Sequence, residues 1–398
     1  MARQWWQRPQ LRTDEERHIE RRASWLELFF DLVFVAVIAV IAHDLSVDPS
    51  WEGLRTFVLL FVPVWWIWVG ATIYSDRLES DDASHRLLHF AIMIPVVGLA
   101  FFAHGAVGDT AAGFALCYAA ARAIIVVAWL RGGRHNPQLR PLTTRYVAGY
   151  SISIALWVAS VFVDEHARYA LWVAGLTVDL ITPVLTVSVQ QRMASLSMSR
   201  LPERLGLFTI IVLGESVIGV ASGIAGLEGL SPAAGLSGVL GLAIAFAIWW
   251  IYFDDVGDHH QRVGPHRSLW GIVWVYLHLP LMIGLTAIGA ATLQVVAAPV
   301  DVPVDGIRWM LTGAVATVSI AIGAVVLTQD GTDGAEHHAA IWVARAATAG
   351  GALLVGLYGD ALTSVALMAV LLALVVGQLV VGVYLRAVEP ATEAASPD

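Results

Sequence analysis

The sequence predicts an all-α integral membrane protein with about twelve transmembrane helices, arranged as a 6+6 parallel internal duplication. Three observations predict this fold class. Apolar residues make up 58% of the 398 residues and charged residues only 14%, whereas soluble domains carry about a quarter charged residues. Apolar runs long enough to cross a bilayer recur along the whole chain. They are continuous rather than alternating, which favours helices over a barrel.

The runs follow one another with short polar connections. The first six cover residues 25–46, 51–75, 86–104, 110–131, 145–163 and 167–190. The second six cover residues 203–223, 232–253, 268–294, 307–328, 339–358 and 361–386. The run 339–358 is the least typical, because it is rich in Ala and Gly and contains Arg345.

These runs divide the chain into five parts. They are a basic cytoplasmic segment 1–24, a first six-helix membrane unit 25–190, a cytoplasmic linker 191–202, a second six-helix unit 203–386 and a disordered acidic tail 387–398. No cleavable signal peptide is expected. The first apolar run is too long for one, it follows a charged segment, and no short apolar core is followed by a small-residue cleavage site.

The arginines predict the orientation. All 23 basic residues are Arg, which excludes the Schiff-base chemistry of lysine. With the N-terminus inside, 18 arginines fall on the inner side and three, Arg55, Arg168 and Arg308, on the outer side. This bias follows the positive-inside rule and predicts an inner-membrane protein with both termini in the cytoplasm.

The predicted duplication rests on one repeated pattern. A shift of 184 residues (215 − 31) places Asp31 on Glu215, and Trp65-Trp66-Ile67-Trp68 on Trp249-Trp250-Ile251-Tyr252. An even number of spans in each copy makes the copies parallel, as in transporters with a six-plus-six plan. Chance similarity between apolar segments is the alternative.

Asp31 and Glu215 are the first candidate functional residues. Along a helix, Asp31 lies about 13 Å beyond Arg22 and Glu215 about 17 Å beyond Arg204, too deep for a short side chain to reach the interface easily. Intramembrane acids usually face a bundle interior or an ion path. We therefore expect this pair to bind protons or substrate. The alternative is a protonated acid that locks two helices together.

Three further residues could contribute to this site. Glu27 lies four residues before Asp31, on the same stripe of the helix; an interfacial structural role is equally open. Arg122 and Asp179 lie at similar depths in the fourth and sixth runs, and a buried arginine needs an acid or an anionic ligand. An Arg122–Asp179 pair would be structural, whereas an unpaired Arg122 would bind an anionic substrate. Gly219 and Gly223 form a small-residue face that would let Glu215 approach a neighbouring helix.

Polar residues at the cytoplasmic ends of the second and eighth runs form a candidate rim or gate. They are Asp76, Glu79, Asp81, Asp82, Asp254 and Asp255. Acids beside His259-His260 suggest a divalent metal, but the spacing fits no defined metal site. Solvated loops are the favoured interpretation, and we expect no metal and no cofactor.

Other function classes lack their motifs. The sequence contains no phosphate-binding glycine loop, zinc-protease motif or nucleophile elbow, so a soluble catalytic apparatus is not indicated. The scattered arginines form no nucleic-acid patch. The single cysteine, Cys117, excludes an intrachain disulfide. The expected partners are the bilayer and a small solute or proton; the sequence does not predict the oligomeric state.

Four blocks of the chain resemble a known family. They are Glu-Leu-Phe-Phe-Asp-Leu-Val-Phe-Val at 27–35, Arg77-Leu78-Glu79-Ser80-Asp81-Asp82, the block 203–216 ending in Gly214-Glu215-Ser216, and Trp249-Trp250-Ile251-Tyr252-Phe253-Asp254. Together they resemble the bacterial low temperature requirement protein A family. The resemblance implies a polytopic inner-membrane protein related to growth in the cold, with no agreed substrate. The matching motif positions are Glu27, Phe30, Asp31, Asp81, Glu203, Gly206, Gly214, Glu215 and Asp254.

The function predicted from these features is secondary transport of a small solute, coupled to protons through Asp31 and Glu215. The alternative is a membrane-embedded enzyme or sensor that handles lipid with the cytoplasmic Asp/His rim. An ion channel is a third possibility, but no segment resembles a selectivity filter.

Overall fold

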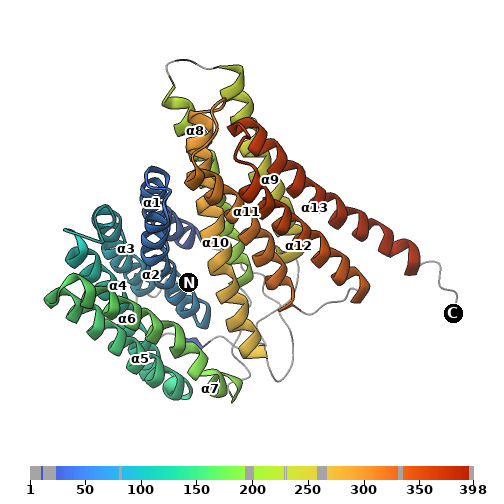
Figure 1. Ribbon diagram of the computed structural model, residues 1–398. Helices are drawn as coiled ribbons and strands as arrows, with labels where there is room; N and C mark the ends of the chain where they lie inside the picture. The colour runs from blue at the N-terminus through green and yellow to red at the C-terminus, as the bar shows by residue number, and fades with distance from the viewer. Residues whose placement is uncertain are drawn as a thin grey trace. The chain divides into compact units, whose positions relative to one another are not determined.

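The computed structural model describes residues 10–11, 24–79, 83–192, 201–227, 229, 231–257, 267–329 and 335–393. Within these ranges the chain is almost entirely helical (Figure 1). A two-residue antiparallel pairing of β1 (Gln10–Leu11) with β2 (Leu78–Glu79) is the exception. Twelve helices among the described residues are long and apolar enough to span a membrane, which confirms the predicted all-α membrane fold, while the 6+6 duplication stays a prediction.

The helices follow the order of the predicted runs. The first are α1 (Trp25–Val47), α2 (Trp51–Arg77), α3 (Ala83–Ala103), α4 (Ala111–His135), α5 (Arg140–Ala159), α6 (Glu165–Leu185) and α7 (Val187–Arg192). The short turns η2 (Pro137–Leu139) and η3 (Ser160–Phe162) flank α5. The later helices are α8 (Leu201–Ala225), α9 (Pro232–Tyr252), the π-helical η4 (Phe253–Gly257), α10 (Arg267–Ala297), α11 (Asp305–Val326), α12 (Ala335–Tyr358) and α13 (Ser364–Glu393).

The chain forms two compact units. The first unit comprises residues 1–44, 55–208 and 264–272, and the second comprises 45–54, 209–263 and 273–398. The division after residue 208 falls inside α8, beyond the linker predicted at 191–202. α13 ends at Glu393, inside the segment predicted as a tail, and residues 394–398 lie outside the described residues.

In the first unit, α3, α4, α5 and α6 pack as successive neighbours. α2 is the most buried spanning helix of this unit, and Trp65, Trp66 and Trp68 are all buried. Large apolar side chains such as Phe101 and Val127 are exposed instead. An exposed apolar surface of this kind suits a helix whose solvent is lipid.

In the second unit, α12 packs against α11 and α13, and α13 also packs against α9. α8 and α10 lie very close together. An added Cβ at Gly219 would collide with the carbonyl oxygen of Gly289, and one at Gly223 would collide with that of Leu293. This contact confirms the small-residue face predicted on α8. Trp249 and Trp250 are partly exposed, unlike Trp65 and Trp66 at the matching positions.

Side chains cap several helices where they begin. At α1, Ser24 Oγ accepts the backbone N–H of Glu27 at 3.2 Å, and Glu27 Oε2 accepts that of Ser24 at 2.8 Å. This reciprocal pair is a capping box. At α6, the Asp164 carboxylate accepts the backbone N–H of Ala167, and this hydrogen bond lowers the pKa of the exposed Asp164 carboxyl group.

Candidate functional site

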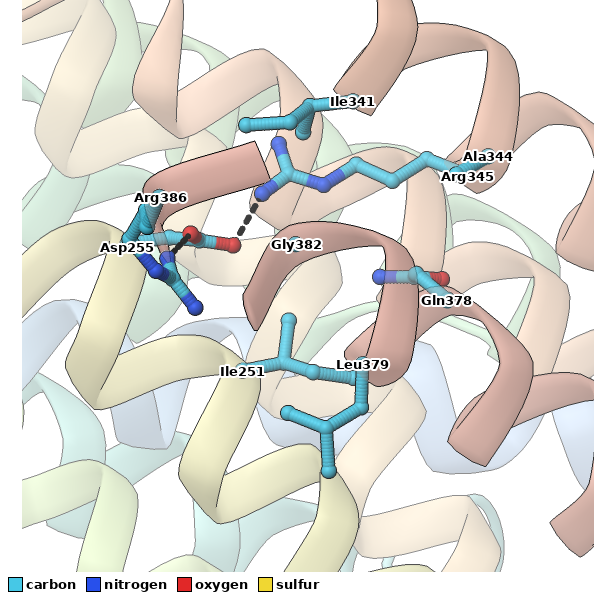
Figure 2. Close-up of a pocket in the computed structure, with 9 residues that line it drawn as sticks. All are labelled: Ile251, Asp255, Ile341, Ala344, Arg345, Gln378, Leu379, Gly382 and Arg386. Carbon is cyan, nitrogen blue, oxygen red and sulfur yellow. Dashed lines mark hydrogen bonds and ion pairs between the residues drawn. The ribbon is translucent and has the colours of Figure 1, made fainter. Parts of the chain in front are cut away.

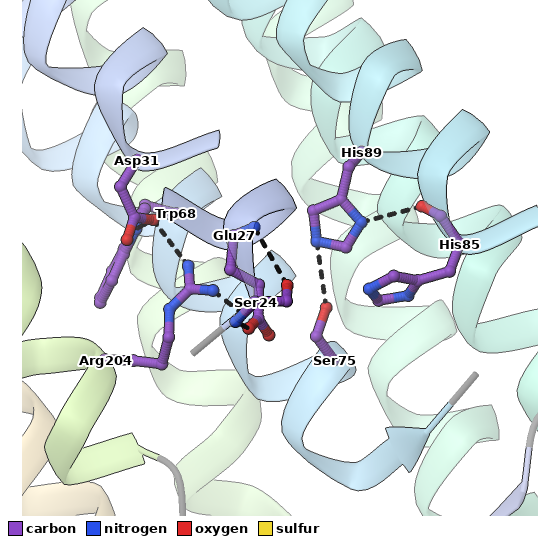
Figure 3. Close-up of polar contacts among 8 residues, drawn as sticks. All are labelled: Ser24, Glu27, Asp31, Trp68, Ser75, His85, His89 and Arg204. Atoms are coloured by element: carbon purple, nitrogen blue, oxygen red, sulfur yellow. Dashed lines mark hydrogen bonds and ion pairs between the residues drawn. The ribbon is translucent and has the colours of Figure 1, made fainter. Parts of the chain in front are cut away.

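Asp31 is completely buried in the first unit, where α1, α2 and the start of α8 supply its neighbours (Figure 3). Its Oδ1 accepts two hydrogen bonds, one from Arg204 Nη2 at 2.6 Å and one from Trp68 Nε1 at 2.7 Å. Phe208, one turn beyond Arg204, stacks on the Trp68 indole with a centroid separation of 4.3 Å. Packed aromatic rings, rather than solvent, therefore surround the Asp31–Arg204 pair.

Glu27 is the second acid on Arg204. Its Oε1 lies 3.3 Å from Arg204 Nη1, and both side chains are buried. The predicted placement of Glu27 and Asp31 on one stripe of α1 is confirmed, because both reach the same guanidinium group. Glu27 also completes the capping box of α1, so it links the start of this helix to Arg204. Glu27 is buried in the protein within the first turn of α1, and its depth in the bilayer stays a prediction.

Two histidines lie beside this cluster (Figure 3). The ring of His89 contacts Phe30 edge-on, with a centroid separation of 4.9 Å, and His85 lies one helical turn before it. His89 Nε2 is 3.3 Å from Ser75 Oγ, and its Nδ1 is 2.9 Å from the carbonyl oxygen of His85. Both ring nitrogens thus have hydrogen-bond partners, which fits the packing or supporting role expected for a buried imidazole.

The predicted Arg122–Asp179 pair is present in the first unit. Arg122 Nη2 donates to Asp179 Oδ1 at 2.6 Å, and neither side chain is exposed. Tyr118 and Ser153 both donate to Asp179 Oδ2, at 2.5 and 2.7 Å. The Arg122 guanidinium carbon also lies 3.9 Å from the centroid of the Tyr150 ring, a cation–π contact. Both oxygens of this carboxylate are occupied, as expected of a structural ion pair.

Glu215 lies in the second unit, on the part of α8 that contacts α10. It is buried, and Gly289 of α10 packs against its backbone so closely that an added Cβ there would come within 2.8 Å of the Glu215 Cβ. The close helix approach expected for Glu215 is therefore confirmed. Its Oε1 has no hydrogen-bond partner among the described residues.

The three deep acids differ in how their carboxyl oxygens are used. Asp31 Oδ2 and Glu215 Oε1 are buried without a partner in the described part of the chain. Asp179 has a donor on each oxygen. A proton can therefore be added to Asp31 or Glu215 at an oxygen that holds no donor, whereas each oxygen of Asp179 already accepts at least one hydrogen bond.

The rim residues are placed differently from one another. Asp76 is buried at the end of α2, and Glu79 lies in β2. Asp81 and Asp82, like His259-His260, lie outside the described residues. Asp254 and Asp255 lie in η4, where Arg386 contacts both carboxylates and Arg345 contacts Asp255. Both acids are ion-paired, but Asp255 is only 11% exposed whereas Asp254 is 37% exposed, so the solvated-loop interpretation fails for Asp255 alone. No group of three or more potential metal ligands occurs among the described residues.

Sequence reasoning missed Arg204 and Trp68 as site residues. It counted Arg204 only as a cytoplasmic topology signal and Trp68 only as part of the repeat. The missed signal is the position of Arg204 at the start of a membrane helix, where its side chain can turn inward. A buried acid with a long-range arginine partner is a common solution when both must lie in the bilayer.

Comparison with known proteins completes this description. Residues 22–378 match the model of a family described as bacterial low temperature requirement A protein. The chain belongs to this family. Glu27, Asp31, Trp68, Arg204 and Glu215 all fall inside the matched region. An uncharacterised protein of Rhizobium meliloti (strain 1021) is similar, with 29% identity over 293 residues, covering 69% of this chain and 70% of the relative.

Proposed function

We propose that this member of the family is a proton-coupled secondary transporter of a small solute, with Asp31 and Glu215 as its proton-carrying groups. It would lie in the inner membrane with both termini in the cytoplasm, as the arginine distribution predicts. The bilayer and the transported solute are its proposed partners. The membrane architecture and the family membership are compatible with this function and do not by themselves identify it.

The observation that carries the proposal is the open carboxyl oxygen on each acid. Proton coupling requires a buried group that gains and loses a proton without dismantling its surroundings. Asp31 meets this requirement, since Oδ1 holds Arg204 and Trp68 while Oδ2 stays available. Arg204 supplies a fixed positive charge that stabilises the ionised state. The aromatic packing around it limits access of water to the pair.

Arg122 and Asp179 have a supporting role in this proposal. Their mutual ion pair and the three donors on Asp179 tie α4, α5 and α6 together. A substrate anion would have to compete with a carboxylate that is already present and fully hydrogen-bonded. We therefore assign this pair to the scaffold rather than to the transported solute.

The internal duplication remains part of the proposal. Within the first unit α5 packs against α4 and α6, and within the second unit α12 packs against α11 and α13. These are corresponding helices if the chain is a duplicated six-helix unit. However, α3 packs against α4 and α9 against α13 without equally close α10–α11 or α2–α6 packing among the described residues, so the proposed repeat rests on the sequence pattern. The different exposure of the two tryptophan pairs shows that matching residues have different surroundings in each copy.

The test uses the purified chain in liposomes that contain a pH-sensitive dye. A panel of metabolites and cations is added outside, and proton movement is recorded. We expect at least one solute to drive proton flux that Asp31→Asn and Glu215→Gln each abolish. Glu52→Gln is the matched control, since Glu52 is an exposed acid in α2 and its loss should leave flux unchanged.

Equal flux in the wild type and both deep-acid variants would contradict the proposal. Absence of flux across the panel, in folded and oriented protein, would favour the alternative of a lipid-handling enzyme or sensor at the rim. In that alternative, Asp254 and Asp255 would act while paired with arginines.

A further inference from the structure

A small pocket lies within the second unit, where α9, η4, α12 and α13 meet (Figure 2). Asp255, Arg345 and Arg386 line it together with Gln378 and several apolar side chains. Its cavity volume is about 10 Å³, enough for about one water molecule. A larger ligand could enter only if one of the lining side chains moved.

The two arginines share one carboxylate. Asp255 accepts from Arg345 at Oδ2, and from Arg386 Nη1 at Oδ1, 2.6 Å away. Arg386 also donates to Asp254 at 2.8 Å, and Trp250 donates to the same Asp254 oxygen at 2.8 Å. Asp254 is therefore held by other groups, while Asp255 is the only carboxylate bound to Arg345 among the described residues.

Arg345 has more donors than Asp255 can satisfy. Its side chain is 1% exposed, and its Nε and Nη1 have no hydrogen-bond partner among the described residues. Figure 2 shows the guanidinium group turned into the pocket, with one terminal nitrogen toward Asp255 and the other toward Ile341. Buried donors without an acceptor are unfavourable, so an additional oxygen-rich acceptor would stabilise this site.

The pocket lies at one end of the membrane-spanning segments. Asp255 precedes the last residue of the span Pro232–Val256, and Arg386 precedes the last residue of the span Ser364–Ala387. In a bilayer, the ends of spanning helices are expected where the phospholipid phosphates meet the hydrocarbon. Apolar residues beside the arginines, such as Ile251 and Leu379, suit the upper part of an acyl chain.

We propose that Arg345 and Arg386 form a binding site for a phosphate-bearing anion, which takes the place of the Asp255 carboxylate between them. Guanidinium groups bind phosphate oxygens through charge-assisted hydrogen bonds, and Nε and Nη1 of Arg345 are two donors that have no acceptor among the described residues. Asp255 closes the empty site and competes with the ligand. The source of the anion is a lipid headgroup or free phosphate. This proposal does not depend on proton-coupled transport.

Two binding measurements on the full chain distinguish the sources. In phosphatidylcholine nanodiscs, radiolabelled inorganic phosphate is titrated against a chloride control of equal ionic strength. In mixed phosphatidylcholine and phosphatidylglycerol membranes, native mass spectrometry counts the phosphatidylglycerol retained on the extracted protein. Phosphate binding identifies the free anion, whereas selective retention of phosphatidylglycerol identifies the headgroup; either result supports the site.

We expect substitutions of Arg345 and Asp255 to change the affinity for the anion in opposite directions. Arg345→Gln should weaken binding by about tenfold or more, since it removes a charged hydrogen-bonding partner. Asp255→Asn should strengthen binding, because it removes the competing negative charge. Arg134→Gln removes an exposed arginine of α4 and should have no effect. If Arg345→Gln does not fold, Arg386→Gln replaces it, because Arg386 is one-third exposed.

Three results would overturn the site. They are absence of binding in both measurements, equal weakening by Arg134→Gln and Arg345→Gln, and weakened or unchanged binding in a folded Asp255→Asn variant. The last result would mean that Asp255 is a structural partner of the arginines rather than a competitor for them.

Discussion

Two buried arginine–carboxylate sites lie within the first unit, and they differ in how many donors their carboxyl groups accept. Asp179 accepts three hydrogen bonds, which occupy both of its oxygens. Asp31 accepts two, both at Oδ1, and shares its arginine with Glu27. Equal burial therefore does not imply an equal role. The distribution of donors separates a carboxylate with a hydrogen bond on each oxygen from one with an open oxygen.

The largest loss of stability is expected for Asp179→Asn. The amide nitrogen must face either the Arg122 guanidinium or the two hydroxyl donors, and the Arg122 charge loses its buried counter-charge. We expect a loss of about 3–5 kcal/mol in the free energy of unfolding. Thermal unfolding in detergent, monitored by size-exclusion chromatography, measures this loss of stability. A variant as stable as the wild type would show that the pair is not structural.

Trp68→Phe should have the next largest effect. It removes the Nε1 donor to Asp31 while keeping an aromatic ring against Phe208. A hydrogen bond to a charged group contributes about 2 kcal/mol, and that much stability should be lost. The double variant with Asp31→Asn should lose less than the sum of the two single losses. Strict additivity would contradict the role of Trp68 as a partner of Asp31.

Gly289→Ala extends the comparison to the acid of the second unit. The new methyl group would lie 2.8 Å from the Cβ and from the carbonyl carbon of Glu215. At that distance α8 or α10 would have to shift. Overpacking of this kind costs about 1–3 kcal/mol. Gly214→Ala is the matched control, because nothing described lies within 4 Å of a Cβ there. If both variants lost equal stability, helix flexibility rather than the α8–α10 contact would explain the effect.

Asp31→Asn should have the smallest effect on stability. The amide oxygen can keep both donors of Oδ1, and the amide nitrogen can occupy the open position of Oδ2. Glu27 keeps a counter-charge beside Arg204, so we expect a loss of only about 1 kcal/mol from the weaker, neutral hydrogen bonds, together with complete loss of proton-coupled flux. A loss as large as that of Asp179→Asn would remove the distinction between the two sites.

The sequence was sufficient to predict the helices and the Arg122–Asp179 pair. Long apolar runs must form helices in a bilayer, and two lone opposite charges at similar depths have few other partners. It was not sufficient for Arg204, which follows a polar connection and lies 173 residues from Asp31 along the chain. Charge at a helix end is compatible with solvent or with an inward turn, and only tertiary packing decides between them.

A similar limit applies to Asp255. The polar run after the eighth apolar segment resembles an exposed loop, yet η4 directs Asp255 toward Arg345 and Arg386. Arg345 stood out as an arginine within an apolar run, but the sequence predicted no partner for it. The pairing with Asp255 depends on the π-helical geometry of residues 253–257, which has no signal in hydropathy.

The capping box of α1 connects chemistry with helix order. Glu27 Oε2 holds the first amide of the helix, while Oε1 faces Arg204. If Arg204 moves when Asp31 changes its charge, Glu27 must either follow it or keep its cap. The opening of the first turn of α1 would then vary with the protonation state of Asp31, which lies one turn further along the helix. Hydrogen exchange of the backbone amides in that first turn would report this state without any transported solute.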